Sequence, residues 1–396
     1  MSRFLFVVPP LVGHINPAVG VAAALQAKGH RVAWAGVPEI ITPLAGADAT
    51  VFGCAGPRLG TGDAARPDLR GLAALKLLWE HFFLPLADAM APGVLTAVER
   101  FHPDVLVADQ QALAGGLIAE RLGIPWATSA TTSGELVGSL DGMPKVQAWL
   151  NGLLDGLRQR TGDPAGAADP RFSPHLLLAF TTAEFVGPSL QAGPQVRFVG
   201  PVLRSRRSTA QFPWSWLDPA RQTVLITLGT VSAEVGARFL AQCTEAALAR
   251  SDRLQTVIVD PTSSLRRIAD GVLTTPRVPQ LELLDHVDAV VCHAGHNTVC
   301  EALWHGLPLV VAPIRDDQTI IAQQVADAGA GIRVRFNRVD AQRLGTAIDT
   351  VLGRPDYRTA AGRVSRSFRA AGGADAAAGH LERIANQPAV AGRHAR

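Results

Sequence analysis

The chain has 396 residues, of which 47% are hydrophobic and 18% are charged. This length exceeds that of one ordinary domain, so two large domains or three small ones are expected. The composition excludes a wholly disordered or collagen-like protein. With 37 basic and 34 acidic residues the net charge is only +3, which is too balanced to indicate a nucleic-acid or anionic-membrane partner.

The cysteines and the N-terminal segment indicate the compartment. None of the four cysteines forms a CxxC pair, and each lies in or beside an apolar segment, which is typical of buried thiols in a reducing cytoplasm. The apolar run at residues 4–8 is interrupted by Pro9-Pro10 and is too short to span a membrane. We therefore expect a cytoplasmic protein without a membrane span. The cysteines are Cys54, Cys243, Cys292 and Cys300.

The first 37 residues predict a strand, a loop, a helix and a second strand. Phe4–Val8 is an apolar run of strand length, and Arg31–Val37 is another. Between them, Pro17 suits the first helical position, Ala18–Lys28 contains helix formers, and Gly29 suits the helix end. Together these segments predict a βαβ unit.

A second unit of this kind is expected further along the chain. It begins with a strand at Val105–Ala108 and continues with a helix over Gly115–Leu122, which Gly123 ends. A short strand follows at Trp126–Ser129. The segment 134–157 is apolar, rich in glycine and weakly helical, and it does not fit a sheet.

Residues 204–212 are polar and lie between two proline-containing stretches, which is typical of a linker. After them the alternation restarts, so the sequence predicts two successive α/β sheets. Ligands of such sheets bind outside the carboxyl ends of the strands, and a cleft between the two domains is the expected site. The later strands are predicted at Thr223–Leu228, Thr256–Val259, Ala289–Cys292, Leu309–Ala312 and Ile332–Phe336, and the helices at Val235–Ala249, Thr298–His305 and Asp317–Ala328.

Two residues of the first half can form a general base. His14 lies in the predicted loop after the first strand, where the neighbouring Gly13 leaves room for a substrate, and histidine titrates near neutral pH. Asp109 ends the strand Val105–Ala108 at the same sheet edge and can orient the imidazole. The alternatives are a histidine bonded to the backbone and an aspartate that only caps a helix. Asp104 precedes the strand, faces the opposite edge and is the poorer candidate.

In the second half, a strand, a glycine-containing turn and a helix start follow one another over residues 290–298. This arrangement directs backbone N–H groups and the positive helix end at an anion, and a diphosphate fits it. Gly229 and Thr230 end another strand and can add an amide and a hydroxyl. The alternative for Asn297 and Thr298 is that they only cap the helix.

Other polar residues near this turn have open interpretations. His293 and His296 are either ligand groups or satisfied core histidines, and metal binding with the nearby cysteines matches no standard zinc spacing. Asp317 and Gln318, with Asp316 before them, follow the strand Leu309–Ala312. They either bind hydroxyls of a polar ligand or cap the next helix.

These segments resemble the GT-B glycosyltransferases that use nucleotide sugars on natural products, a group that includes plant secondary-product, macrolide and carotenoid glycosyltransferases. The likeness covers nearly the whole chain. In the first half it rests on Gly13-His14-Ile15-Asn16-Pro17 and Val107-Ala108-Asp109, which match the positions of the family's base and its partner. Its most specific part is the donor-binding signature, Arg277-Val278-Pro279-Gln280, His293-Ala294-Gly295-His296-Asn297-Thr298-Val299-Cys300-Glu301 and Asp317-Gln318.

The resemblance implies an α/β protein with two Rossmann-like domains facing across a cleft. It also implies that the donor is a UDP- or dTDP-sugar and that no other cofactor is needed. The implied parts are an acceptor-binding domain at 1–203, a linker at 204–215, a nucleotide-sugar-binding domain at 216–371, and a helix that crosses back to the first domain with a tail at 372–396.

The resemblance implies a role for each matching residue. His14 takes the proton of an acceptor hydroxyl, and Asp109 stabilises the imidazolium. In the donor site Arg277, Val278 and Gln280 meet the nucleoside, Glu301 holds the ribose, Thr230, His293, Gly295, Asn297 and Thr298 hold the diphosphate, and Asp317 and Gln318 hold sugar hydroxyls.

Arg277 departs from the family pattern, which often has a tryptophan there that stacks on the base. A guanidinium plane also stacks on a nucleobase, so Arg277 keeps this role while uridine and thymidine remain alternatives.

Donors at the helix end are expected to stabilise the leaving diphosphate, and attack from the opposite face inverts the anomeric centre. No Asp-x-Asp signature precedes the phosphate site, which agrees with a metal-independent reaction.

The acceptor is expected to be a hydrophobic small molecule, such as a polyketide or macrolide aglycone, bound by the first domain. Aromatic and apolar side chains suit such a ligand, and plain core packing is the alternative for each of them. The protein is expected to be a monomer or a homodimer. The candidate acceptor-binding residues are Trp79, Phe82, Phe83, Leu136, Met143 and Trp149.

Three other functions remain as alternatives. A nucleotide-sugar epimerase of the same fold would bind the same donor but would not need a base that faces a foreign hydroxyl. A nicotinamide-dependent oxidoreductase fits less well, because the first turn lacks Gly-x-Gly-x-x-Gly and Gly60-Thr61-Gly62 does not follow a convincing strand. A non-catalytic accessory protein predicts a lost base or a broken phosphate site, and both are intact here.

Overall fold

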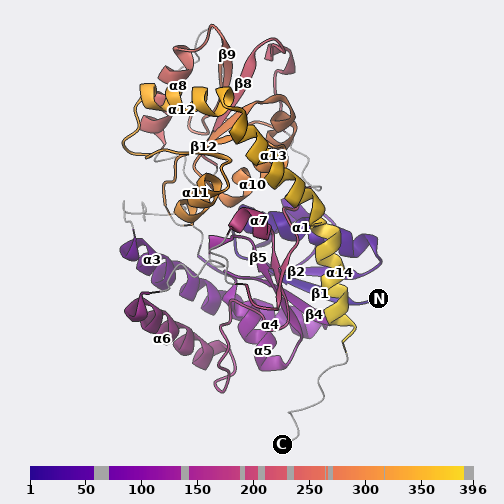
Figure 1. Cartoon of the computed structure of the whole chain (residues 1–396). Coiled ribbons are helices and arrows are strands. Elements are labelled where there is room, and N and C mark those ends of the chain that lie inside the picture. Colours follow the sequence, from indigo (N-terminus) through magenta and orange to yellow (C-terminus); the bar gives the residue numbers. More distant parts are fainter. Residues whose placement is uncertain are drawn as a thin grey trace, which may run out of the picture. The chain divides into compact units, whose positions relative to one another are not determined.

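A computed structural model of the chain describes residues 1–57, 71–134, 142–187, 192–203, 210–229, 236–263, 265, 271–315 and 317–387. The chain divides into two compact units, which Figure 1 colours along the sequence. The first unit comprises Met1–Phe180, Gln191–Ser205 and Ala371–Arg396, and the second comprises Thr181–Leu190 and Arg206–Ala370.

Among the described residues, the first unit has a seven-stranded parallel sheet with the order β3-β2-β1-β4-β5-β6-β7. Alternate residues of its central strand enter different cores: Leu5 and Val7 pack in one cluster, and Phe4 and Phe6 pack in another. Helices therefore cover both faces, which explains the continuous apolar strands. The strands are β1 (Arg3–Val7), β2 (Arg31–Gly36), β3 (Thr50–Gly53), β4 (Val105–Asp109), β5 (Trp126–Ala130), β6 (Leu177–Ala179) and β7 (Val196–Phe198).

The first helix begins earlier than the sequence predicts. It runs over Val12–Ala27, so His14 lies in its first turn and not in a loop, which corrects the expected start at Pro17. Pro17 has no backbone N–H and therefore removes one intrahelical hydrogen bond from α1. The helix start is held by the backbone N–H groups of His14 and Ile15, which both donate to the carbonyl of Leu11. The helices of this unit are α1 (Val12–Ala27), α2 (Pro38–Ala45), α3 (Leu72–Leu78), the π-turn η1 (Trp79–Phe83), α4 (Leu84–Phe101), α5 (Leu113–Leu122), α6 (Pro144–Thr161) and α14 (Gly373–Ala385).

The last helix, α14, packs beside α1 in the first unit (Figure 1). Its buried residues Ala377 and Leu381 belong to the same core cluster as β1. Glu382 accepts hydrogen bonds from Lys28 and pairs with His30. The C-terminal end of the described chain is thus an integral part of the unit that contains the N-terminus.

The second unit has a six-stranded parallel sheet with the order β10-β9-β8-β11-β12-β13 among the described residues. Residues 181–187, within the range expected for the first domain, pack here, because Phe185 lies against Phe368 and Thr182 accepts from Ser367. The strands are β8 (Gln222–Thr227), β9 (Leu254–Val259), β10 (Val272–Thr275), β11 (Ala289–Cys292), β12 (Leu309–Val311) and β13 (Gly331–Arg333). The helices are α7 (Ala183–Val186), η3 (Trp214–Trp216), α8 (Ala237–Leu248), α9 (Gln280–Leu283), η5 (Leu284–His286), α10 (His296–Trp304), α11 (Gln318–Asp327), α12 (Ala341–Gly353) and α13 (Pro355–Ala370).

One helical run among the described residues, Leu72–Phe101, is long and apolar enough to cross a membrane by length and composition alone. Its side chains Leu86, Met90 and Val94 are fully buried in the core cluster that also contains Leu5 and Val7 of β1. These contacts are those of a core helix in a folded unit, which accounts for its apolar composition.

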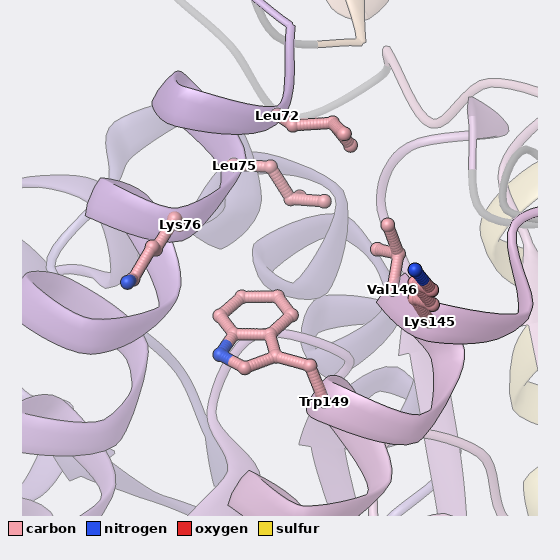
Figure 2. A pocket seen from close by; sticks show the side chains of 6 residues that line it. All are labelled: Leu72, Leu75, Lys76, Lys145, Val146 and Trp149. Carbon is pink, nitrogen blue, oxygen red and sulfur yellow. The ribbon is translucent and has the colours of Figure 1, made fainter.

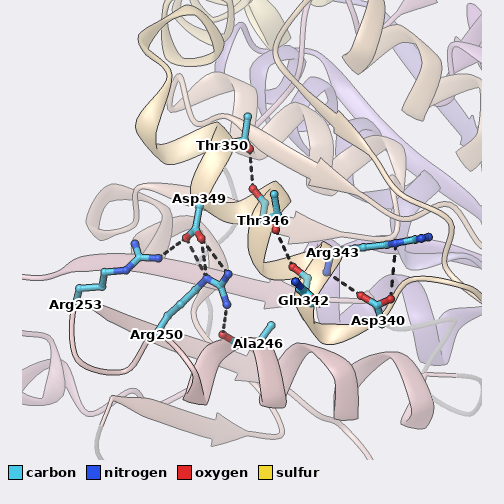
Figure 3. Close-up of polar contacts among 9 residues, drawn as sticks. All are labelled: Ala246, Arg250, Arg253, Asp340, Gln342, Arg343, Thr346, Asp349 and Thr350. Carbon is cyan, nitrogen blue, oxygen red and sulfur yellow. Dashed lines mark hydrogen bonds and ion pairs between the residues drawn. The ribbon is translucent and has the colours of Figure 1, made fainter.

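A polar cluster joins α8 to α12 in the second unit (Figure 3). The Arg250 guanidinium bonds both oxygens of Asp349, Arg253 donates a further hydrogen bond to this carboxylate, and Arg250 also donates to the carbonyl of Ala246. Partial burial by itself raises the pKa of Asp349, but the hydrogen bonds and charges of the two arginines outweigh it and lower the pKa below its ordinary value. This cluster fixes the packing of two helices.

Candidate active site

His14 and Asp109 meet in the first unit, as the sequence predicts. β4 ends at Asp109, and the adjacent β1 leads into α1, which carries His14. The Nδ1 atom of His14 lies 3.0 and 3.1 Å from the two carboxylate oxygens of Asp109. The Asp109 side chain is fully buried, whereas that of His14 is 16% exposed. An ionised carboxylate only accepts, so Nδ1 carries the proton and Nε2 is the basic nitrogen.

The base site has a third member that sequence reasoning missed. The hydroxyl of Thr131 lies 2.6 Å from His14 Nδ1 and donates to Asp109 Oδ2 at 2.9 Å. Thr131 directly follows β5, which pairs with β4. A hydroxyl after a predicted strand, beside the strand that ends in Asp109, was the signal that could have found it.

The turn between β11 and α10 has the predicted form. Ala294 has a positive φ of 64°, and Gly295 is the N-cap of α10, so the N-cap position itself has no side chain. Asn297 and Thr298 follow in the first turn and are partly exposed, and the first turn contains no acidic residue. The positive end of α10 therefore has the composition of an anion site.

The His293 imidazole lies between two glycines at this turn. A Cβ atom at Gly229 would lie 2.8 Å from its Cε1, and one at Gly295 would lie 2.3 Å from its Nε2. Burial lowers the pKa of His293 to about 4, the charge of Asp317 opposes this shift and that of Arg315 adds to it. His293 is therefore neutral near pH 7. Among the described residues its Nδ1 has no hydrogen-bond partner.

The residues expected around the nucleoside lie on α9, α10 and the loop before them. Gln280 donates a 2.5 Å hydrogen bond to the buried carboxylate of Glu301, which fixes that side chain. Val278 packs against the core of the second unit, and Arg277 is exposed. The contact between Gln280 and Glu301 joins two residues of the signature that lie 21 positions apart.

The residues expected to hold the sugar lie at the start of α11. Asp317 is the N-cap residue and is partly exposed. The amide oxygen of Gln318 accepts hydrogen bonds from the backbone N–H groups of Ile314 and Arg315, so this side chain holds the loop after β12 and leaves its amide nitrogen as the donor group. Thr230 and Asp316 lie outside the described residues.

The candidate acceptor residues separate into two groups. Trp79, Phe82 and Phe83 are at most 4% exposed and belong to the core that packs against β1, which favours the core-packing alternative for them. Met143 is exposed just before α6, and Leu136 lies outside the described residues.

Trp149 lines a pocket between α3 and α6 (Figure 2). The pocket has a volume of about 200 Å³ and an apolar lining, with Leu72 and Leu75 on one side and Val146 on the other. Lys76 and Lys145 also line the pocket, but most of its surface is apolar, so it suits an apolar ligand.

Metal and thiol chemistry have little support in the described part of the chain. No group of three or more His, Cys, Asp or Glu side chains within it could hold a metal ion. The four cysteines are free and buried, as predicted, and burial raises the pKa of each thiol. Neutral buried thiols are poor nucleophiles.

Comparisons with known proteins agree with this geometry. Residues 246–382 match the family model described as Erythromycin biosynthesis protein CIII-like, C-terminal domain. The 4'-demethylrebeccamycin synthase of Lentzea aerocolonigenes is 30% identical over an alignment of 413 positions, gaps included, which covers 93% of this chain and 96% of that protein.

Solved structures share the fold over nearly the whole chain. The glycotransferase of kitacinnamycin has a TM-score of 0.79 and 26% identity, covering 97% of this chain and 98% of its own. The spinosyn rhamnosyltransferase SpnG complexed with thymidine diphosphate has a TM-score of 0.72 and 25% identity, covering 96% of this chain and 100% of its own. With two parallel α/β sheets and a full-length relative at 30% identity, this chain belongs to the GT-B natural-product glycosyltransferases.

Proposed function

We propose that this glycosyltransferase moves a sugar from a UDP- or dTDP-sugar to a hydroxyl of a hydrophobic small molecule, with inversion and with His14 as the general base. The observation that carries the proposal is the contact of the partly exposed His14 ring with the fully buried Asp109 carboxylate. This pair is at the carboxyl end of β4, where ligands of parallel sheets bind.

The proposed reaction is a single displacement. The acceptor oxygen forms a bond to the anomeric carbon while the bond from that carbon to the diphosphate oxygen breaks. The hydroxyl proton passes to Nε2 of His14, and the electron pair of the broken bond leaves with the diphosphate. Because the nucleophile enters opposite the leaving group, the configuration inverts. The step involves no net oxidation or reduction, so it balances without a cofactor.

The turn of the second unit supports the choice of donor. Gly229 and Gly295 keep side chains away from His293, and the N-terminus of α10 offers N–H groups to a diphosphate. The neutral His293 ring can donate one hydrogen bond without adding a charge. The buried Glu301 carboxylate suits ribose hydroxyls. SpnG is solved with thymidine diphosphate, which supports a dTDP-sugar. The UDP-sugar is proposed beside it because uridine and thymidine are both pyrimidine nucleosides.

The pocket between α3 and α6 supports a hydrophobic acceptor. Its lining of Leu72, Leu75, Val146 and Trp149 suits the apolar part of an aglycone. SpnG is also solved with a spinosyn aglycone, which is consistent with an acceptor of this class here. The four buried free cysteines support action in a reducing cytoplasm.

Transfer assays test this proposal directly. The purified protein is incubated with UDP- and dTDP-sugars and a set of hydrophobic phenols and alcohols, and free nucleoside diphosphate and glycoside are measured. We expect equal amounts of both products, and an inverted anomeric proton coupling in the glycoside by NMR. A glycoside of retained configuration, or an epimerised donor with no glycoside, would overturn the proposal.

A further inference from the structure

Thr131 contacts both members of the proposed base pair. Its Oγ1 lies 2.6 Å from His14 Nδ1 and 2.9 Å from Asp109 Oδ2. Thr131 is 3% exposed and Asp109 is 2% exposed. The three polar groups therefore form a closed triangle of contacts, two of whose members are buried.

The hydrogen atoms of this triangle follow from the chemistry of the three groups. The ionised Asp109 carboxylate only accepts, so the Thr131 hydroxyl donates to Oδ2. A lone pair of the same hydroxyl oxygen then accepts from the Nδ1–H of His14. The reverse arrangement would place an unprotonated Nδ1 lone pair against both carboxylate oxygens at 3.0 and 3.1 Å, which is repulsive.

The two acceptors of the Nδ1–H group come from different strands. Asp109 ends β4, and Thr131 follows β5, whose Ser129 is in register with Asp109. The carboxylate is itself held at both oxygens, because the backbone N–H of Gln111 donates to Oδ1 at 2.9 Å and Thr131 donates to Oδ2. The sheet thus sets the direction of both acceptors, and a ring held at two points has less freedom to turn than a ring held at one.

We propose that Thr131 is a positioning residue for sugar transfer, which holds the His14 ring so that Nε2 meets the acceptor hydroxyl. Thr131 acts through His14 and Asp109 and does not touch the reacting atoms. This inference rests on the proposed role of His14 as the base. A misplacement of about 1 Å in a reacting group can cost roughly a hundredfold in rate, so a fixed orientation of the His14 ring matters for kcat.

The test compares three variants. Thr131→Val removes the hydroxyl and keeps the shape, and Thr131→Ser restores the hydroxyl. Thr128→Val is the matched control, because Thr128 is a fully buried threonine of β5 whose hydroxyl donates to the carbonyl of Arg171 and accepts from the backbone N–H of Ser173, away from the base site. Melting temperatures verify that each variant folds, and Thr131→Ala replaces the valine variant if that one does not.

The readout is the dependence of kcat on acceptor ionisation. Two acceptors of similar shape are used, an un-ionised phenol that needs a base and a nitrophenolate that is already ionised. We expect Thr131→Val to lower kcat for the phenol by about 10- to 100-fold, with the donor KM unchanged and little loss for the nitrophenolate. Thr131→Ser should restore most of the rate, and Thr128→Val should show no acceptor dependence. Equal losses with both acceptors, or no loss, would overturn the inference.

His14→Ala separates this inference from the proposed function. If His14→Ala slows the phenol reaction selectively and Thr131→Val does not, His14 is the base and the inference about Thr131 is wrong. If His14→Ala slows both acceptors equally or neither, the proposed role of His14 is wrong as well.

Discussion

The base site of the first unit (His14, Asp109 and Thr131) and the phosphate turn of the second (residues 293–295 with the start of α10) use opposite means. In the base site, side chains bond to one another in a buried triangle. At the phosphate turn, Gly229 and Gly295 make room for the His293 ring, and the N-cap position of α10 has no side chain. The difference teaches that a proton acceptor must be aligned before the substrate arrives, whereas an anion site must leave room for its ligand.

Removing the imidazole is expected to have the largest effect on the base site. His14→Ala should lower kcat by roughly a hundred- to ten-thousand-fold, because the acceptor hydroxyl loses its base, and the donor KM should change little. Initial rates across pH measure this. His175→Ala is the control, because His175 is an exposed histidine of the same unit. Full activity of His14→Ala at every pH would contradict the account.

At the phosphate turn, a single added methyl group should abolish the room that the glycines provide. The Cβ of Gly295→Ala would lie 2.3 Å from His293 Nε2, so the imidazole must shift and the shape of the turn must change. We expect UDP or dTDP to bind at least about 10-fold more weakly by calorimetry. Gly353→Ala is the control, because a Cβ there meets nothing within 4 Å. Unchanged binding by Gly295→Ala would remove the diphosphate from this turn.

The nucleoside part of the donor site is separable from the phosphate turn. Glu301→Gln should weaken UDP or dTDP binding by about 10-fold, because ribose hydroxyls lose a charged acceptor that Gln280 holds in place. Binding of inorganic pyrophosphate should not change, since it has no ribose. Competition between these ligands and a labelled nucleotide measures both affinities. An equal loss for pyrophosphate would mean that Glu301 supports the turn and not the ribose.

The cluster of Asp349, Arg250 and Arg253 is a polar network that only joins helices, so its loss should change stability and not catalysis. Asp349→Asn is expected to cost about 0.5–1 kcal/mol at neutral pH, because the carboxylate is 36% exposed and solvent screens the pairs. Its pKa is lowered in the folded state, so this contribution is present above the ordinary value of 3.8 and is lost as pH falls through the folded value.

Thermal melts at pH 7 and at pH values well below 3.8 measure this difference, which should amount to about 1–3 °C at pH 7 and vanish once Asp349 is protonated in the folded state. Asp356→Asn is the control, because Asp356 is highly exposed and its ion pair is with the neighbouring Arg354. Reduced transfer activity in folded Asp349→Asn would contradict a purely structural role.

The sequence predicts those parts of the structure that depend on local patterns. Ala289–Cys292 forms a strand with the predicted bounds, and Gly123 ends α5 with a positive φ. The short strands β3, β6 and β7 have only three or four residues, too few for a clear periodicity. The early start of α1 was missed because Pro17 resembles a first helical residue, although a proline is also tolerated further into the helix.

The candidate site was predictable where a residue type and a strand end coincide, as at Asp109. Thr131 was missed because threonine is common after strands and only the pairing of β4 with β5 gives it a partner. Aromatic residues such as Trp79 and Phe83 occur both in ligand pockets and in hydrophobic cores. Only their burial in the structure shows that they belong to the core. Long-range contacts are therefore the information that local sequence patterns lack.

Nucleotide-dependent thermal stabilisation of the purified protein tests the central claim most directly, because a ligand that binds only the folded state raises its stability by an amount that grows with the logarithm of ligand concentration over Kd. UDP, dTDP, GDP, ADP and NAD are compared at equal concentration, with Gly295→Ala alongside. We predict that UDP or dTDP alone raises the melting temperature and that Gly295→Ala reduces the shift. Stabilisation by NAD alone, or by none of the five, would contradict a pyrimidine-diphosphate site in the second unit.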